Sequence, residues 1–369
     1  MATPVTMEPR RRITAARVPG RPAIRLGRFS VVWRPRTVIV IVATAALLLL
    51  GMALNIGRGE FPISVSDVLS VLLGGGDAGQ QFIVLDLRLP RSLTGALVGA
   101  ALAVGGAITQ TIARNPLASP DVIGFTAGAS AAAVFLIVLG GGFGALGGIL
   151  ALAGLPMAAL FGGLLTATAI YLLAWRNGVQ GFRLVLVGIG INAMLFAIVQ
   201  WLLVVAEVYE AARAYTWLNG SLNARGWENV VPVGIALLVL VPAALILAHV
   251  LGALSFGDDT ARGLGISVDK SRTWLLVVAV GLVAVATASA GPIAFVALVA
   301  PQIAQRLVGA ARPPIAASMF VGAALTVIAD LIARTAFGAT ELPVGIITAV
   351  LGAPYLLFLL ARHGREARA

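Results

Sequence analysis

LSFGDDTARGLGISVDKSR, residues Leu254–Arg272, is the polar island around which the rest of this sequence is organised. It lies between two long apolar runs, Val230–Leu251 and Trp274–Val296, and contains three acids, three bases and the only lysine of the chain. A connector between membrane helices needs only a few turn residues. This stretch instead predicts a short helix, with Asp258 as its N-cap and Gly265 as its end. Such a helix with an apolar edge is suited to packing against a partner protein. The alternative is that this stretch is an ordinary solvated connector.

The composition is that of a protein dissolved in lipid. The chain has 369 residues, of which 59% are hydrophobic and 11% charged, and its mean hydropathy is +1.00. A soluble domain has roughly 25% charged residues, so the sequence predicts an integral membrane protein. The absence of cysteine excludes disulfides, thiolate metal sites and cysteine nucleophiles. The only two histidines, His249 and His363, lie at ends of apolar runs, a position more typical of interfacial side chains than of metal ligands.

The basic residues are concentrated at the start of the chain. Nine of the 26 lie between Arg10 and Arg36. We therefore attribute the net charge of +11 to the orientation of the chain in the membrane and not to the binding of nucleic acid. Residues 1–36 predict a disordered cytoplasmic tail that touches anionic lipid. A cleaved signal peptide is the alternative, but the basic region is too long and no A-x-A site follows the apolar run Thr37–Leu54. That run predicts a retained first transmembrane helix.

The apolar runs predict an all-α, polytopic membrane protein with about ten transmembrane helices, since a crossing takes about 20 residues. The sequence predicts a ten-helix membrane domain at residues 37–361, from which residues 252–271 project, and a short cytoplasmic tail at residues 362–369. Gly291-Pro292 and Pro301 interrupt the apolar sequence around the eighth and shortest span. The ten predicted spans are Thr37–Leu54, Leu93–Ala113, Val122–Leu139, Gly147–Trp175, Leu184–Val205, Val230–Leu251, Arg272–Ala290, Ile293–Val308, Ile315–Phe337 and Leu342–Ala361.

An even number of spans places both termini on one side of the membrane. On the side of the basic tail the sequence places twenty lysines and arginines, and on the opposite side five: Arg58, Arg88, Arg91, Arg213 and Arg225. The positive-inside rule therefore predicts cytoplasmic termini and a cytoplasmic polar island.

Small residues within the second span predict close helix packing. Gly95, Gly99, Ala103 and Ala107 recur at a four-residue spacing, which lets two helix backbones approach. The pentapeptide VGAAL occurs at Val98–Leu102 and again at Val321–Leu325, within the ninth span. In so alanine-rich a chain we treat the match as chance rather than as a repeat.

Few polar residues lie within the spans. Asp330 and Arg334 are spaced i, i+4 and predict an intramembrane ion pair near the outer end, in preference to a substrate contact. No span contains a series of acids or histidines, the chain has no Walker A pattern, and it has no catalytic triad or metal cluster. The sequence therefore predicts a non-enzymatic pathway that another subunit drives. Neutral side chains that line this pathway or join helices are Gln110, Asn115, Asn192 and Gln200.

Four stretches resemble one known family over nearly the whole length, from about Thr37 to Ala361. These are RLPRSLTGALVGAALAVGGAITQTIARNPLASPDVIG (88–124), the polar island, AGPIAFVALVAPQIAQRLVG (290–309) and ELPVGIITAVLGAPYLLFLL (341–360). They are similar to the FecCD family, the iron-siderophore and vitamin B12 importer permeases of ABC transporters. Residues 172–195, and GSLN at 220–223 with the polar island, look most like ferric-enterobactin permease subunits of the G type. The basic tail lies outside this pattern, and Gln302 and Gln305 stand where the family usually has His and Arg.

This resemblance implies a type II ABC importer permease in a bacterial cytoplasmic membrane. It implies a heterodimer with a related permease, two cytoplasmic ATPase subunits that bind ATP and Mg, and an extracytoplasmic binding protein. The cargo would be a ferric siderophore, with a catecholate favoured, and this chain would hold no cofactor. An ion- or proton-driven secondary transporter is the alternative, because broken helices suit that class too.

The resemblance also assigns roles to particular residues. On the outer face, arginines would meet carboxylates of the binding protein, with Arg58 the first candidate and Arg88 and Arg225 behind it. The polar island would form the helices that couple to the ATPase. Its matching residues are Gly257, Asp258, Asp259, Ala261, Leu264 and Gly265.

Overall fold

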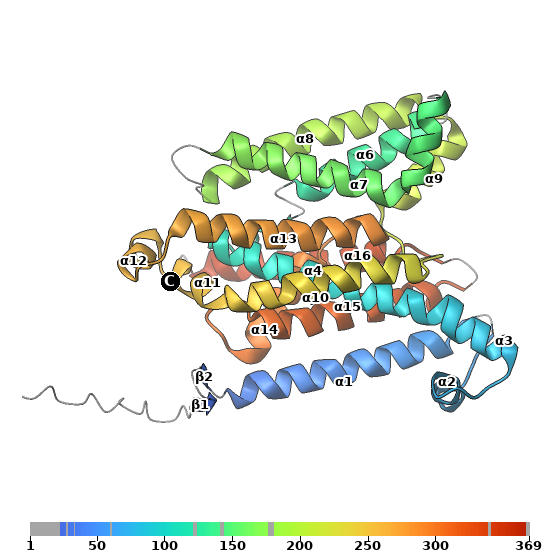
Figure 1. Ribbon diagram of the computed structural model, residues 1–369, viewed down its shortest axis with the longest axis horizontal. Coiled ribbons are helices and arrows are strands. Elements are labelled where there is room, and N and C mark those ends of the chain that lie inside the picture. The colour runs from blue at the N-terminus through green and yellow to red at the C-terminus, as the bar shows by residue number, and fades with distance from the viewer. Residues whose placement is uncertain are drawn as a thin grey trace, which may run out of the picture.

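The computed structural model describes residues 23–26, 29–32, 34–59, 61–120, 124–140, 144–175, 181–338 and 341–366, and the regular secondary structure of this part of the chain is helical apart from one hairpin (Figure 1). Ten helices overlap the ten predicted spans, although the helix at the predicted span Val230–Leu251 already ends at Ile246. In chain order they are α1 (Pro35–Gly57), α4 (Leu89–Ala113), α6 (Phe125–Leu139), α7 (Gly144–Ala174), α8 (Gly181–Val205), α10 (Trp227–Ile246), α13 (Val268–Ala290), α14 (Val296–Val308), α15 (Ile315–Thr335) and α16 (Val344–Glu366).

Seven helical segments in the described residues are long and apolar enough to cross a membrane, and α6, α14 and the apolar part of α16 are shorter. The shortness of α14 follows from the sequence before it. Gly291 ends α13 with φ 75°, and Phe295 caps α14 with φ 66°. A break in α7 occurs at Gly154 (φ 71°), so that Pro156 lies in the first turn of the helix that follows, where proline is tolerated.

Short elements lie at the two ends of the long helices. At one end are α2 (Val65–Leu72), α3 (Ala78–Gln81) and α9 (Val208–Leu218), and the π-helix η1 (Phe82–Arg88) joins α3 to α4. At the other end are α11 (Ala248–Leu254) and α12 (Asp258–Gly263), together with the start of α1 and the end of α16 (Figure 1). We refer to these as the α2 end and the α12 end.

The antiparallel hairpin β1 (Ala23–Leu26) and β2 (Phe29–Val32) lies within the segment for which the sequence predicts disorder. The prediction of a tail without regular structure is therefore not met at these residues. Ile24, Phe29 and Val31 are residue types that favour strands, and two short runs of them separated by a glycine form a hairpin sequence that the arginines around them obscure.

The helices form a central group flanked on both sides. In Figure 1, α4, α10, α13, α14, α15 and α16 lie together, α6–α9 pack beside α13, and α1 packs along the opposite edge beside α15. The most enclosed helix is α4, whose buried residues run from Pro90 to Ile112 almost without interruption.

Glycine brings α4 and α15 into backbone contact. A Cβ on Gly99 would lie 2.3 Å from the carbonyl oxygen of Gly322, and a Cβ on Gly322 would lie 2.4 Å from that of Gly99. The predicted small-residue ridge is thus confirmed at Gly99. The two glycines belong to the two VGAAL sequences, at Val98–Leu102 and Val321–Leu325, so the pentapeptides cross each other directly. The sequence alone gave no reason to expect this contact.

Candidate functional site

The polar island folds into a compact projection at the α12 end. Helix α12 begins after Gly257 (φ 115°) and ends before Gly265 (φ 80°). The N–H of Gly265 donates to the Arg262 carbonyl (2.9 Å), and that of Ile266 donates to the Ala261 carbonyl (3.0 Å), which is a Schellman ending. The predicted end at Gly265 is confirmed. The predicted N-cap is wrong by one residue, because the cap is Gly257, which has no side chain that could accept a capping hydrogen bond.

Asp258 is held by arginines of its own chain instead of capping α12. Its Oδ1 lies 3.0 Å from Nη2 of Arg272, and it also forms an ion pair with Arg114. Arg114 donates through Nε to the Leu254 carbonyl at 3.1 Å. Burial raises the pKa of Asp258, but the two arginines outweigh burial and lower the pKa overall. These contacts attach α12 to the start of α13 and to the end of α4.

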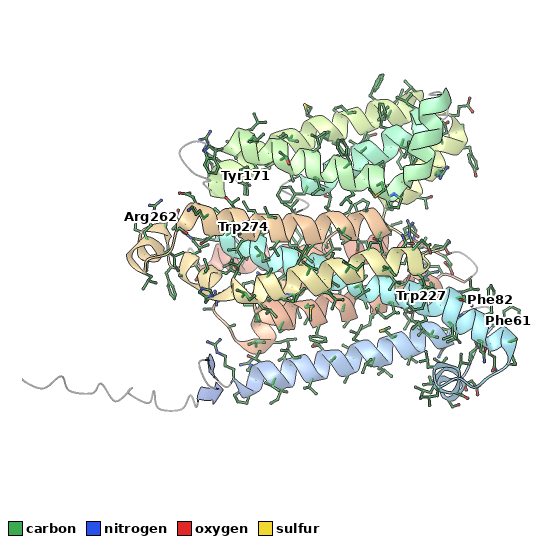
Figure 2. The ribbon with its side chains drawn as sticks, in the orientation of Figure 1. Phe61, Phe82, Tyr171, Trp227, Arg262 and Trp274 are labelled. Carbon is green, nitrogen blue, oxygen red and sulfur yellow. The ribbon has the colours of Figure 1, made fainter. Side chains whose placement is uncertain are left out.

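The outward face of the projection is apolar at two positions. Leu264 is 65% exposed and Phe256 is 76% exposed, whereas Ala261 is fully buried. Asp259 is exposed and makes only a 3.3 Å pair with Arg262, which is labelled in Figure 2. Among the six predicted coupling residues, Leu264 and Asp259 therefore face outward, while the others shape or anchor the helix. The sequence analysis missed Phe256, although an aromatic residue in a polar segment was a visible signal.

The three arginines predicted to dock an external partner lie in different surroundings at the α2 end. Arg58 follows α1 and is exposed. Arg225 is half-buried and donates through Nε to the Ser221 carbonyl at 3.2 Å, and burial lowers its pKa against the opposing effect of Glu228. Arg58 and Arg225 remain available to a partner in this geometry.

Arg88, unlike Arg58 and Arg225, is buried within the chain. It is 8% exposed, and its two terminal nitrogens donate to the Ile56 and Phe61 carbonyls at 2.8 and 2.7 Å. This guanidinium supplies hydrogen-bond donors to backbone carbonyls at the end of α1 and in the loop after it. The geometry does not support a docking role for Arg88, because its hydrogen-bonding groups are used within the chain.

Asp330 and Arg334 do not form the direct ion pair that their spacing predicts. Asp330, whose side chain is 1% exposed, pairs with Arg91 of α4 at 2.9 Å and accepts a 2.9 Å bond from Asn55 of α1. Arg334 donates to Asn55 Oδ1 at 2.8 Å and lies 3.6 Å from Glu341. Arg91 also reaches Glu341 at 2.9 Å. We call these five residues the outer cluster.

The outer cluster joins three helices and a loop that are distant in the sequence. Its two acids balance its two arginines in formal charge, and most of the side chains are buried. Burial raises the pKa of Glu341, but Arg91 and Arg334 outweigh this effect and lower it overall. The i, i+4 prediction failed because Arg91, 239 residues away, offers Asp330 a bidentate guanidinium that Arg334 cannot match across one helical turn.

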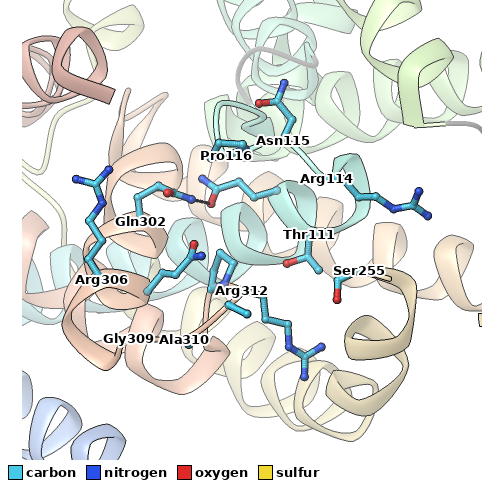
Figure 3. A pocket seen from close by; sticks show the side chains of 14 residues that line it. Thr111, Arg114, Asn115, Pro116, Ser255, Gln302, Arg306, Gly309, Ala310 and Arg312 are labelled. Carbon is cyan, nitrogen blue, oxygen red and sulfur yellow. Dashed lines mark hydrogen bonds between the residues drawn. The ribbon is translucent and has the colours of Figure 1, made fainter. Parts of the chain in front are cut away.

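The predicted pathway residues divide into two groups. Gln110 is buried, donates to the Leu298 carbonyl at 2.9 Å and accepts from Gln302 Nε2 at 2.7 Å, so it joins α4 to α14 (Figure 3). Asn115 Oδ1 accepts from the Leu117 N–H at 2.9 Å. On α8, Asn192 is half-buried and Gln200 is exposed. Gln110 is therefore a helix-interface residue, and Gln200 lies on an open helix face.

A cavity of about 510 Å³ opens beside the Gln110–Gln302 bond at the α12 end (Figure 3). Its polar lining includes Asn115, Gln305 and three arginines, Arg114, Arg306 and Arg312. The guanidinium of Arg306 also lies over the ring of Tyr355, 5.3 Å from its centroid. The two glutamines that depart from the family pattern, at 302 and 305, thus face the same cavity.

Comparisons with known proteins agree with one another. A profile described as the FecCD transport family matches residues 47–362. The ferric enterobactin transport system permease protein FepG of Escherichia coli (strain K12) is 42% identical over 84% of this chain and 91% of its own. The achromobactin transport system permease protein CbrC of Dickeya dadantii (strain 3937) is 41% identical, covering 92% and 96%.

Two further similarities extend the comparison. The iron(3+)-hydroxamate import system permease protein FhuG of Bacillus subtilis (strain 168) is 36% identical over 89% of this chain and 98% of its own. Among solved structures, an ABC transporter described as of the metal-chelate type, in an inward-facing conformation, superposes with a TM-score of 0.77. It has 28% identity and covers 88% of this chain and 99% of that chain.

Proposed function

This chain belongs to the FecCD transport family of ABC-transporter permeases, and on that premise we propose that it forms the membrane pathway of a ferric-siderophore importer. It is the transmembrane subunit of such a transporter, and ATP is hydrolysed on a separate subunit. Relatives named for enterobactin, achromobactin and hydroxamate chelates favour an iron chelate as cargo. A catecholate is our finer proposal, supported by the similarity to the enterobactin permease.

The observation that carries the proposed coupling role is the way in which α12 is held. A buried alanine, two glycines in left-handed conformations and the Asp258 ion pairs fix a helix of one and a half turns against α13 and α4. On this rigid base, Leu264 and Phe256 project outward without cover. We propose that both side chains enter a groove of the ATPase subunit, so that movement of that subunit reaches the membrane helices.

The open face of α8 supports pairing with a second permease. Phe196, Gln200 and Val204 follow one another at i, i+4 and i+8 and are all exposed. An amide facing lipid is costly, so a polar residue on such a face favours cover by protein or water. The exposed face of α1 differs, because Ile39, Val42 and Leu49 are purely apolar and suit lipid. We propose that α8 contributes to the interface with a related permease and to the pathway.

The proposed orientation places the α12 end in the cytoplasm. Arg114, Arg272 and Arg312 lie near this end, together with the start of α1 that follows the basic tail. The positive-inside rule supports cytoplasmic termini in a bacterial cell membrane. Arg58 and Arg225 at the opposite end would then meet carboxylates of an external binding protein.

Uptake of radioactive iron tests the function directly. Proteoliposomes would contain this chain, its partner permease, the ATPase and the binding protein, and catecholate, hydroxamate and citrate chelates would be compared with and without ATP. We expect ATP-dependent uptake of a catecholate chelate. Uptake driven by an ion gradient without ATP would favour a secondary transporter, and ATP-dependent uptake of another chelate would correct only the cargo.

A matched pair of variants tests the coupling helix in the same system. Leu264→Glu places a charge on the outward face of the projection, and we expect loss of ATPase retention during purification and loss of uptake. Leu73→Glu makes the same change at a residue that is 89% exposed at the α2 end, and the ATPase should be retained. Equal retention in the two variants would remove Leu264 from the interface.

A further inference from the structure

A second cavity at the α12 end has a lining that the transport function does not explain. It encloses about 1050 Å³ between the start of α1, the α10–α11 junction and the turn that joins α14 to α15. Three arginines line it, Arg34, Arg36 and Arg312, and the described residues of its lining include no carboxylate. The remaining lining residues are mostly apolar, among them Leu245, Ala248 and Leu251. We call it the basic cavity.

Arg312 is the least satisfied of these arginines. Its Nη1 is buried and has no hydrogen-bond partner in the part of the chain that the structure describes. A Cβ on Gly252 would lie only 2.6 Å from this nitrogen, so the guanidinium lies directly against the backbone of α11. Burial, and then the like charge of Arg34, lower the pKa of Arg312. Arg312 is half-buried, and leaving the buried edge of a guanidinium without a hydrogen-bond acceptor is costly, which points to an anion that completes the site.

Arg36 lines the same cavity as Arg312 and is held by hydrogen bonds to backbone carbonyls. Its Nε donates to the Leu307 carbonyl at 2.6 Å and its Nη2 to the Arg306 carbonyl at 3.3 Å. These carbonyls end α14, where a cation is favourably placed. Gly309 (φ 67°) makes room, because a Cβ there would lie 2.9 Å from Arg36 Nη1. Arg36, which is hydrogen-bonded to the end of α14, and Arg312, which lies against α11, thus line one cavity from segments far apart in the sequence.

The surroundings of the basic cavity indicate which anion would enter. Arg34 and Arg36 flank the first turn of a membrane helix, which is the depth of lipid headgroups. From there the exposed side chains of Ile39 and Val42 continue along α1, and Leu245 and Ile246 are exposed on α10. A basic cavity between helices that opens onto apolar helix faces matches a lipid with an anionic headgroup and acyl chains. A soluble anion would make no favourable contact with the apolar walls of the cavity.

We propose that the basic cavity binds an anionic phospholipid, whose phosphate oxygens accept hydrogen bonds from Arg312 and Arg36 while an acyl chain lies along α1 and α10. The site does not depend on the identity of the cargo. It also contacts α11, whose last residues lead directly into α12 through Ser255 and Phe256. A bound lipid would therefore stabilise α11, the segment that leads into the projecting helix α12.

The test measures lipid-dependent thermal stability of the full-length chain, purified in detergent with its partner permease. Dioleoylphosphatidylglycerol, dioleoylphosphatidylcholine and inorganic phosphate would be added separately, and the folded fraction followed by fluorescence-detected size exclusion. We expect phosphatidylglycerol alone to raise the unfolding midpoint by several degrees. Equal stabilisation by phosphatidylcholine would overturn the anionic site, and equal stabilisation by phosphate would show a soluble-anion site instead.

Variants of this chain locate the effect. Arg312→Gln should weaken phosphatidylglycerol binding at least fivefold, as read from the lipid concentration that gives half of the shift. Arg262→Gln removes an exposed arginine of α12 that does not line the cavity, and should leave the shift unchanged. If Arg312→Gln does not fold, Arg34→Gln, at an exposed position on the cavity rim, should give a smaller loss. An unaltered shift in every folded cavity variant would refute the proposal.

Discussion

Arginines at the two ends of the helices have contrasting surroundings. In the outer cluster, Arg91 and Arg334 share two carboxylates and an asparagine, and Arg91 reaches its nearest acid at 2.9 Å. In the basic cavity at the α12 end, Arg36 and Arg312 face no carboxylate among the lining residues. An arginine whose partners lie in its own chain fastens helices together. An arginine such as Arg312, half-buried in a cavity without an acid among its lining residues, indicates a partner from outside.

The largest effect should follow from removing the central acid of the outer cluster. Asp330→Asn leaves Arg91 buried with its charge only partly balanced, and breaking a buried pair in this way costs about 3–5 kcal/mol. We expect a strong fall in the unfolding midpoint and in the yield of folded protein. Glu341→Gln is the control, because Glu341 is 40% exposed, and a half-exposed pair is worth at most about 1 kcal/mol. A similar cost for both variants would contradict the central place of Asp330.

An intermediate effect should accompany protonation of Asp258. Its pKa is lowered in the folded protein, so its pairs contribute fully above the ordinary carboxyl pKa of about 4 and are lost as the pH falls through the lower folded value. A spin label on Thr260→Cys, the only cysteine, would report the mobility of α12. We expect constant mobility from about pH 8 to 5 and a rise below about pH 4.

Charge-neutral variants provide the control for that titration. Asp258→Asn should give the mobile spectrum at every pH, at a cost of about 1–2 kcal/mol for bonds to a charged group. Asp259→Asn, with an exposed side chain, should reproduce the unmodified titration. If Asp259→Asn mobilises α12 as much as Asp258→Asn does, the anchoring contacts have been misassigned.

The smallest effect should come from a variant that adds an acidic side chain to the lining of the basic cavity. Ser255 lines the cavity and donates to the Gly252 carbonyl at 2.7 Å, next to Arg312. Ser255→Asp would supply a carboxylate and stabilise the chain by less than about 1 kcal/mol. It should also abolish the phosphatidylglycerol-dependent shift. Ser271→Asp adds the same charge at the start of α13, outside the cavity, and should preserve that shift; a loss in both variants would indicate a general charge effect.

Much of the architecture could be predicted from local signals. The ten helices follow from runs of apolar residues, and the end of α12 follows from Gly265, because a left-handed residue is needed there. The projection of the polar island also follows from its composition, since such residues cannot enter lipid. Each of these signals is contained within about twenty consecutive residues.

The polar contacts could not be predicted in the same way. The spacing of Asp330 and Arg334 predicted a pair on one helix, but Asp330 pairs with Arg91. Likewise, Asp258 resembled an N-cap until the fold brought Arg114 from 144 residues away. The neighbours that decide such contacts come from helices whose order in space is absent from any single stretch of sequence.

By itself, the sequence determined that this protein is a helical membrane protein with a short projecting helix, because hydropathy and glycine act locally along the chain. Only the tertiary structure decided which side chains meet. It set Gly99 against Gly322, turned Leu264 and Phe256 outward, and gave Arg91 two acids while leaving Arg312 beside none. The physical reason is that packing and charge pairing act between atoms close in space, and helix packing brings together residues hundreds of positions apart.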